Sequence, residues 1–512
     1  MGRGNLEAVC SVPRGARSIV MKLLFADNWH FHRRNFLPIF EALKKDSLPH
    51  KFETSRRSWW KAHGRYEHLS KSLKKSIEFI DQHDDLRAIH CLDVNLWEIS
   101  KAEFLCSALT QNHWHVGGIP NESDSVFEFA MANPQDKEAL RLCLAAAHNW
   151  LLFWNQYLDG HVDISHAIVF SGSYIYTRSL MALAKQRDIS VLVAEHFFTG
   201  NDFYLEYRDG PIANNCGVKR DFSFHSCIKE NEAKVTASAY AHSRMKGMKN
   251  RNVPQKNISF KNPWGDKNPI ILIIGQVAND FSIIETPSDE VSSIASYKQG
   301  IIELLKNTKA NVIFKAHPWE RRRAPLFRPL TKIKIDEFIQ SLPEKDQARI
   351  ALIENESIQS IFLICDGVMG ISSQGLLEAC YYGFKPVLIG DTFFSNKGFT
   401  QSANQNPNLL NKSFDKKMWK LSLKEYELFQ DFMESMFTEA LIPNSKFASG
   451  LICEKLLDSH AKPSAKHLLG TIRTPKMKWT DLLGDVYERP HAWMRLSGIW
   501  IKSKLKSSKP SK

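Results

Sequence analysis

The sequence lacks the short motifs that mark several large enzyme classes. It has no GxxxxGK[ST] segment, and no GxGxxG opens a strand–helix unit, so P-loop nucleotide hydrolysis and the usual dinucleotide fingerprint are excluded. It also has neither an HExxH segment nor a DxD segment. We therefore expect no catalytic zinc, no metal-held sugar diphosphate and no bound cofactor.

Cysteine pairs and long apolar runs are also missing. The nine cysteines include no CxxC pair and no Cys/His group at zinc spacing, so neither a disulfide framework nor a structural metal is expected. This pattern favours a reducing cytoplasm. No apolar run approaches the roughly twenty residues of a transmembrane helix, so any membrane contact is expected to be peripheral.

The chain does have ample core material and an excess of positive charge. Its 512 residues, 43% of them hydrophobic, suit two α/β domains better than one core. The net charge of +13 favours anionic partners such as nucleotides, acidic sugars or an anionic membrane face. Nothing beyond this charge indicates nucleic-acid binding, so no nucleic-acid partner is expected.

The amino-terminal half alternates short β-branched runs with helical patterns. Residues 1–20 have no apolar core of a signal peptide and are expected to be either an unstructured leader or an untranslated stretch before a start at Met21. Over residues 21–255 we predict a first Rossmann-like domain on the acceptor side, followed by a linker at 256–268. Its predicted strands are 22–26, 87–92, 166–172 and 190–196, with helices at about 136–157 and 175–187.

A second series of the same kind is predicted over residues 269–455. Its strands are 269–275, 311–317, 349–354, 367–371 and 386–390, with helices near 294–307, after Ser357 and at 374–382, the last closed by Gly383. Residues 456–512 read as a last helix and a basic tail. The expected fold class is α/β, with two doubly wound domains facing a central cleft.

In such sheets ligands bind beyond the carboxyl ends of the strands, so the polar residues that follow each strand are the candidates. Gln276 and Asp280 follow one strand, and Asp280 could be a nucleophile, a base or a helix cap. Lys315 and His317 end the next strand, where they suit recognition of a phosphate or a carboxylate.

Two more strand ends carry similar candidates. Ser372 and Ser373 stand where a strand meets a helix, so hydroxyls and backbone N–H groups could hold an anion or merely cap the helix. Glu378 on that helix could face a ribose. Glu195 ends a hydrophobic strand, where burial could raise its pKa and make it an acid or base, and His196 follows it.

The first strand is followed by DNWHFHRR at 27–34. Asp27, His30 and Arg33 are candidates for the acceptor side, although a solvated basic loop is the simpler interpretation of the same residues. No family motif matches this part of the chain.

Four segments in order resemble the capsule polysaccharide biosynthesis family, the bacterial retaining β-Kdo glycosyltransferases of the Kps type. They are VLVAEHFFTGNDFYLEYRDG (191–210), IIGQVANDFSI (273–283), NVIFKAHP (311–318) and MGISSQGLLEACYYGFKPVLIGDTFFSNKGFT (369–400). Four ordered segments are far more specific than any one of them.

The resemblance implies a GT-B-like fold and transfer of Kdo, or a related 2-keto sugar acid, from a CMP-activated donor with retention and without metal. The acceptor would be a surface glycan or its lipid anchor. It further implies Asp280 as nucleophile, Glu195 as acid/base and His317 against the donor. Ser372 and Ser373 would hold the CMP phosphate, with Gln276, Lys315 and Glu378 as further donor contacts.

One departure concerns the acceptor side. Many relatives carry Glu-Asp-Gly or Glu-Asn-Gly where this chain has Glu195, His196 and Phe197, so the loop that shapes the acceptor differs. Two alternatives remain: a sialyltransferase-like enzyme that also uses a CMP-sugar, and a non-catalytic component of capsule assembly or export.

Overall fold

The computed structural model describes residues 21–213, 241–245, 258, 260–265, 267–286, 289–318, 320, 329–403 and 416–457. The predicted leader and almost all of the predicted tail lie outside these residues. So do parts of the predicted linker.

The first half is built on a six-stranded sheet with the order β14-β7-β6-β5-β1-β2. Four neighbouring strands are parallel, namely β2 (His50–Phe52), β1 (Leu23–Phe25), β5 (His166–Phe170) and β6 (Ser190–His196). Strand β7 (Asp202–Tyr207) and strand β14 (Leu441–Pro443) extend the sheet in antiparallel fashion. Among the parallel strands the order of the chain reverses between β1 and β5.

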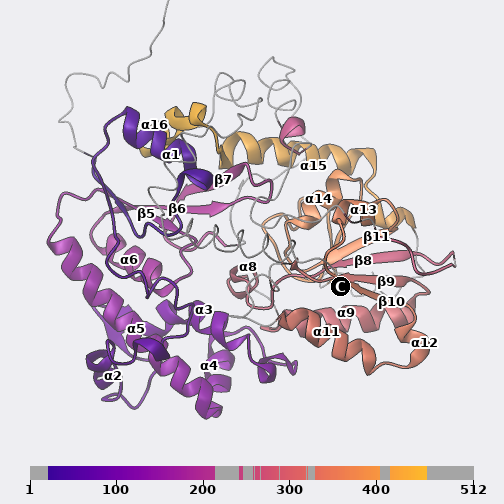
Figure 1. Cartoon of the computed structure of the whole chain (residues 1–512), viewed down its shortest axis with the longest axis horizontal. Coiled ribbons are helices and arrows are strands. Elements are labelled where there is room, and N and C mark those ends of the chain that lie inside the picture. The colour runs from indigo at the N-terminus through magenta and orange to yellow at the C-terminus, as the bar shows by residue number, and fades with distance from the viewer. Residues whose placement is uncertain are drawn as a thin grey trace, which may run out of the picture.

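Helices lie on both sides of this sheet (Figure 1). They are α1 (Arg33–Lys45), α2 (Lys74–Ile80), α3 (Leu96–Ala108), α4 (Ser123–Ala132), α5 (Pro134–Asp159) and α6 (Ile175–Gln186). The long helix α5 begins well because Pro134 stands in its first turn and Asn133 caps it by accepting from the N–H groups of Gln135 and Asp136.

The second half contains a wholly parallel six-stranded sheet with the order β10-β9-β8-β11-β12-β13. The strands are β8 (Ile270–Ile274), β9 (Asn311–Lys315), β10 (Ile350–Ile353), β11 (Gly367–Gly370), β12 (Val387–Leu388) and β13 (Gln401–Ser402). In chain order this is 3-2-1-4-5-6, the Rossmann order, and it reverses between β8 and β11.

Helices again cover both faces (Figure 1). They are α8 (Phe281–Ile284), α9 (Ser293–Asn307), α11 (Leu330–Gln340), α12 (Glu344–Gln347), α13 (Ile358–Phe362), α14 (Gly375–Tyr381) and α15 (Leu423–Ser435), whereas the last helix, α16 (Ser449–Leu457), lies beside α1 of the first half. Helix α14 stops before Gly383, whose φ of +81° is the left-handed conformation expected of a helix-terminating glycine.

Direct contacts join the carboxyl ends of the two sheets. The N–H of Phe198, just after β6, donates to the side-chain oxygen of Gln374, just after β11 (3.0 Å). Tyr174, after β5, packs edge-on against Phe281, after β8 (ring centroids 5.0 Å). The fold is therefore the predicted GT-B-like pair of Rossmann-type domains, with their ligand-binding edges towards each other.

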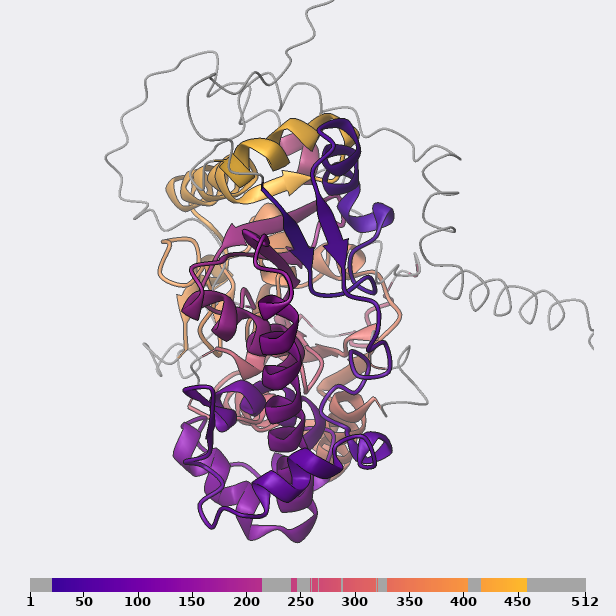
Figure 2. The same cartoon turned by 90° about the vertical axis from the view of Figure 1, so that its left-hand side faces the viewer.

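Two predictions about organisation are wrong. Residues 87–92 are not a strand of the main sheet: β3 (His90–Cys91) pairs with β4 (Val94–Asn95) in a separate hairpin. The second domain does not run to residue 455, because β14 joins the first sheet and α16 packs on α1. Figure 2 shows the yellow carboxyl-terminal helices beside the indigo first helix.

Candidate functional site

The second sheet has its switch point between β8 and β11, and Gln276 links the two strand ends there. Its amide oxygen accepts from the N–H of Ser372 (2.8 Å), and its amide nitrogen donates to the hydroxyls of Ser372 (3.1 Å) and Ser282 (3.2 Å). Gln276 is 4% exposed and Ser372 is 2% exposed. These hydrogen bonds of Gln276 are thus made to protein groups in the loops after β8 and β11. Its predicted contact with the CMP-sugar donor stays a prediction.

Ser373 and Glu378 lie beside this point on the α14 side. The Ser373 hydroxyl accepts from the N–H of Gly375 (3.2 Å) at the start of the helix, so part of its hydrogen-bonding capacity serves the turn. Glu378 is partly buried, which raises the pKa of its carboxyl group against the lowering effect of Gln359 and Lys315. Glu378 and Lys315 are therefore electrostatic neighbours.

Lys315 and His317 follow β9 but differ in their surroundings. Lys315 is 3% exposed, its ammonium donates to the carbonyl of Glu354 (3.0 Å), and burial lowers its pKa to about 8. His317 is partly buried, and burial lowers its pKa to about 4 although Asp280 acts in the opposite direction. The imidazole is therefore neutral near pH 7 and suits hydrogen bonding rather than full proton donation.

Asp280 is both a helix cap and a neighbour of the other candidates. Its side chain accepts from the N–H of Ser282 (2.9 Å) at the start of α8, as the capping interpretation predicts. It also acts electrostatically on His317 and on Glu195. Capping uses one oxygen of the Asp280 carboxylate, and the partly buried carboxylate remains close to both His317 and Glu195.

Glu195 approaches from the first domain at the end of β6. Burial raises its pKa to about 8, and the nearby charge of Asp280 adds to this, while hydrogen bonds from the N–H of His196 and from Ser171 oppose it. The carboxyl group is accordingly protonated over most of the physiological range. The structure thus brings together Glu195, Asp280 and His317 from three loops and two domains.

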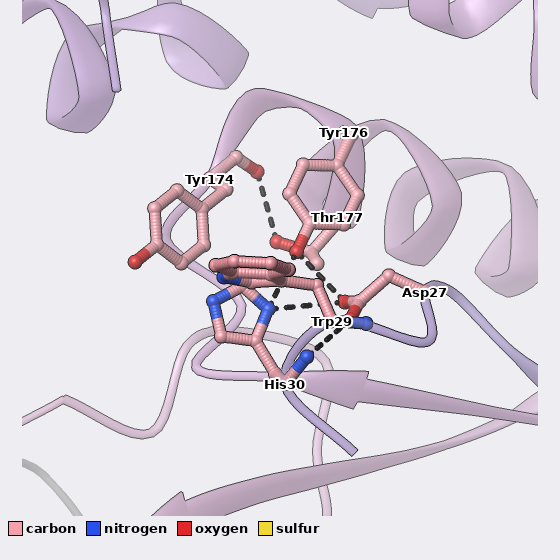
Figure 3. A network of polar contacts seen from close by, with 6 residues as sticks. All are labelled: Asp27, Trp29, His30, Tyr174, Tyr176 and Thr177. Atoms are coloured by element: carbon pink, nitrogen blue, oxygen red, sulfur yellow. Dashed lines mark hydrogen bonds and ion pairs between the residues drawn. The ribbon is translucent and has the colours of Figure 1, made fainter. Parts of the chain in front are cut away.

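The switch point of the first sheet, between β1 and β5, holds Asp27 and His30 (Figure 3). Asp27 is fully buried; one oxygen accepts from the N–H groups of Trp29 (2.8 Å) and His30 (2.7 Å). The other oxygen contacts His30 Nδ1 (3.2 Å) and accepts from the Tyr176 hydroxyl (2.8 Å). Burial would raise the pKa of Asp27, but His30 and Tyr176 together hold it below its usual value.

His196 and Arg33, the other acceptor-side candidates, are placed differently. His196 stacks on Phe36 (5.1 Å between centroids), its Nε2 lies 3.2 Å from the Asn35 amide, and burial lowers its pKa to about 3. Arg33 donates to Glu41 (2.8 Å) within its own helix. His196 therefore adjoins the site, whereas the contact of Arg33 is directed along α1.

Three further residues that support these groups, Ser171, Tyr174 and Tyr176, were not predicted from the sequence. Ser171 and Gly172 adopt positive φ values of 63° and 83°, and this sharp turn after β5 places the Ser171 hydroxyl on Glu195. The His30 ring lies parallel to Phe170 (centroids 4.5 Å, 3°) and near Tyr174 (5.6 Å). The sequence feature that could have indicated these residues is the polar segment SGSYIY, which directly follows a predicted strand.

The described residues lack two features, a membrane-spanning helix and a metal-binding cluster. None of their helices is long and apolar enough to cross a membrane. They also contain no cluster of three or more His, Cys, Asp or Glu side chains suited to a metal ion.

Comparison with solved structures gives distant similarities. Thermosulfurimonas dismutans KpsC, beta Kdo 2,4 transferase, matches at 12% identity over 60% of this chain and 87% of its own, with a TM-score of 0.36. The KpsC beta Kdo 2,7 transferase of the same organism matches at 14% identity over 62% and 87%, with a TM-score of 0.34. Methanocaldococcus jannaschii UDP-GlcNAc 2-epimerase matches at 11% identity over 85% and 99%, with a TM-score of 0.31.

Comparison with curated proteins gave no match. The model of one protein family does match, over residues 225–445, and its description is capsule polysaccharide biosynthesis protein. That range contains Asp280, His317 and the Gln276–Ser372 pair. The resemblance seen in the sequence is confirmed over this range: residues 225–445 match the model of the capsule polysaccharide biosynthesis family.

Proposed function

We propose that the protein is a retaining glycosyltransferase that moves Kdo, or a related 2-keto sugar acid, from a CMP-activated donor to a surface glycan or its lipid anchor. The observation that carries this proposal is the meeting of Glu195, from the first sheet, with Asp280 and His317, from the second. A double displacement requires one carboxylate as the nucleophile and a second carboxyl group that can exchange a proton with the acceptor. The family match and the positive charge of the chain support a polysaccharide role and an acidic donor.

In the first step an Asp280 carboxylate oxygen would attack the anomeric carbon of the donor sugar. The bond from that carbon to the phosphate oxygen breaks, and CMP departs with the electron pair. In the second step the acceptor hydroxyl attacks the same carbon, the bond to Asp280 breaks, and the hydroxyl proton passes to the Glu195 carboxylate. Two inversions give net retention.

Binding of the donor would fall to the switch point of the second sheet. His317, as a neutral imidazole, can donate a hydrogen bond to the leaving phosphate. The Ser373 hydroxyl lies at the start of α14, Glu378 lies on that helix, and Lys315 ends β9, the strand beside β8. A phosphodiester carries one negative charge, which such groups can hold without a metal.

The proposed location of the enzyme is the cytoplasm, at the inner face of the membrane.

The first test is transfer from CMP-Kdo by purified protein, followed by mass measurement of the product and competition with CMP-sialic acid. Asp280→Asn should lower the rate by at least about 1000-fold, because a carboxamide is a poor nucleophile at carbon. Glu195→Gln should accumulate protein heavier by one sugar residue, because the second step is slowed more than the first.

The matched control is Asp289→Asn, an exposed aspartate near the same segment, which should keep the wild-type rate. Wild-type transfer by Asp280→Asn would overturn the assigned mechanism. A preference for CMP-sialic acid would show that the donor carries another sugar acid. It would not contradict the proposed roles of the two carboxylates.

A further inference from the structure

His30, in the loop after β1, is held by a buried carboxylate and a tyrosine hydroxyl. Its Nδ1 lies 3.2 Å from a carboxylate oxygen of Asp27 and 3.2 Å from the Tyr176 hydroxyl, which donates to the same oxygen (2.8 Å). Burial would raise the pKa of Asp27, but His30 and Tyr176 hold it below its usual value, so the carboxylate can only accept. Because the Tyr176 proton is used in this bond, the contact between Nδ1 and Asp27 requires a proton on Nδ1. Asp27 and Tyr176 thus fix both the ring and its tautomer.

The other ring nitrogen of His30, Nε2, faces away from these supports (Figure 3). Within the described part of the chain, the hydrogen bonds of the ring involve only Nδ1. Phe170 covers one face of the ring, with 4.5 Å between centroids and an angle of 3°, and the side chain remains 14% exposed. With the proton on Nδ1, Nε2 of the neutral imidazole carries a lone pair, so it can accept a hydrogen bond from a hydroxyl.

On one side, a single aromatic ring separates His30 from the residue next to Glu195. The Phe170 ring that stacks on His30 also lies against the ring of His196 (5.1 Å between centroids), and His196 directly follows Glu195 on β6. Burial lowers the pKa of His196 to about 3, and the nearby His30 contributes to this. His30 is therefore close to the end of β6 that carries the proposed acid/base.

On the other side, a single ring separates His30 from the residue next to Asp280. Between ring centroids, Tyr174 lies 5.6 Å from His30 and 5.0 Å from Phe281, which directly follows Asp280. A saccharide that brings one hydroxyl between the two reacting carboxylates therefore comes near the exposed edge of His30.

We propose that His30 is a specificity-determining residue of the acceptor site, whose Nε2 accepts a hydrogen bond from a second hydroxyl of the acceptor saccharide. Glu195 receives the proton of the attacking hydroxyl, and Asp27 and Tyr176 are positioning residues that act through His30. The inference rests on the proposed transferase function and adds a requirement on the acceptor. The acceptor must present two hydroxyls, one to Glu195 and one to His30.

The test compares two substitutions that preserve different halves of the imidazole. His30→Asn keeps an amide N–H near the position of Nδ1, so it can still donate to Asp27, but it has no atom at the position of Nε2. His30→Gln places its amide near the position of Nε2 and gives up the contact with Asp27. The probes are the octyl glycoside of Kdo and octyl glucoside, each measured by calorimetry and as an acceptor for CMP-Kdo.

For whichever probe binds the wild type, His30→Asn should raise the Kd and the KM about tenfold, because one hydrogen bond is lost. Its KM for CMP-Kdo should change less than twofold, and its midpoint of unfolding in urea should stay that of the wild type. His30→Gln should keep more of the acceptor affinity but unfold at a lower urea concentration, because buried Asp27 loses a partner. A purely structural role predicts the opposite order of acceptor affinities.

Monodeoxy derivatives of the bound probe identify the hydroxyl that His30 contacts. One derivative should bind the wild type about tenfold more weakly than the parent glycoside does. The same derivative should bind His30→Asn as tightly as the parent does, because one hydrogen bond can be removed only once. If every derivative loses the same affinity in the wild type and in His30→Asn, no hydroxyl contacts His30 and the proposal is overturned.

His113→Asn is the matched control, since His113 also pairs with a buried aspartate, Asp136, elsewhere in the first domain. It should leave the affinity for both glycosides unchanged. The proposal is also overturned if the wild type binds neither glycoside, or if His30→Asn binds them as the wild type does. The calorimetric measurements need no donor, so failure of CMP-Kdo to support transfer would overturn the proposed function separately.

Discussion

At the scale of single residues, the ionisation of Glu195 controls the proposed chemistry. Its pKa of about 8 means that the carboxylate needed to accept the acceptor's proton becomes the major form only above that pH. We therefore expect the transfer rate to rise between pH 6 and pH 8.5, with an apparent pKa near 8, in a stopped assay at saturating donor. In Glu195→Gln this rise should vanish, with a rate loss of about 100- to 10,000-fold.

Ser171 offers a finer test of the same group. Its hydroxyl lowers the pKa of Glu195, so removing it should move the apparent pKa of the rate profile upward. Ser171→Gly is the suitable variant because glycine accepts the positive φ of this position without strain. A downward movement of the profile would show that Glu195 is not the group that titrates.

Individual candidate residues were predictable from the sequence because parallel strands end at one edge. That rule placed Gln276, His317 and Ser372 correctly at strand ends without any knowledge of packing. It did not reveal that the Gln276 amide would form hydrogen bonds with Ser372 and Ser282. The contact with Ser372 depends on β8 and β11 being neighbours in the sheet. Likewise, the role of Tyr176 depends on β5 lying beside β1.

At the scale of elements, the Gln276 link between β8 and β11 has a measurable stabilising role. Gln276→Met keeps the approximate shape of the side chain but leaves the buried N–H of Ser372 without its acceptor. We expect a loss of about 1–3 kcal/mol in the free energy of unfolding by urea, together with weaker CMP binding. Gln299→Met, at an exposed position on α9, should change neither quantity.

Helices and strands with a long, regular hydrophobic pattern could be predicted from the sequence alone. Short strands, and strands that pair with a distant part of the chain, could not. Residues 87–92 read as a strand, but Leu92 and Asp93 both have positive φ (52° and 59°) and fold the chain into a tight hairpin. Strand β14 has three residues, and its partner β7 lies more than 200 residues away in the sequence. Local periodicity carries no information about such a pairing.

At the scale of the whole molecule, several hydrogen bonds join the two halves around the candidate site. Asn279 donates to the carbonyl of Cys106 (2.7 Å), Asn121 donates to that of Thr286 (3.0 Å), and Arg178 pairs with Glu285. The N–H of Val291 donates to the carbonyl of Ile119 (3.0 Å). These contacts hold α3 and α6 against the segment around α8, and so set how Glu195 meets Asp280.

His115 makes this interface sensitive to acid. Its Nε2 faces the carbonyl of Leu109 (2.8 Å), which can only accept, so Nδ1 must accept from the Ser292 hydroxyl (2.7 Å) at the cap of α9. Protonation of Nδ1 would set an N–H against that hydroxyl. Burial accordingly lowers the pKa of His115 to about 4.

A histidine whose pKa is lower in the folded protein binds more protons when unfolded, so it contributes stability that is lost as pH falls from about 6.5 towards 4. We expect the wild type to lose about 1–2 kcal/mol between pH 7 and pH 5 through His115. His115→Gln cannot titrate and should show a correspondingly smaller loss in urea unfolding, whereas His68→Gln, at an exposed site, should follow the wild type. If His115→Gln loses stability as steeply as the wild type, acid acts elsewhere, and the partly buried His196 and His317 become the groups to replace, since their pKa values are lowered in the same direction.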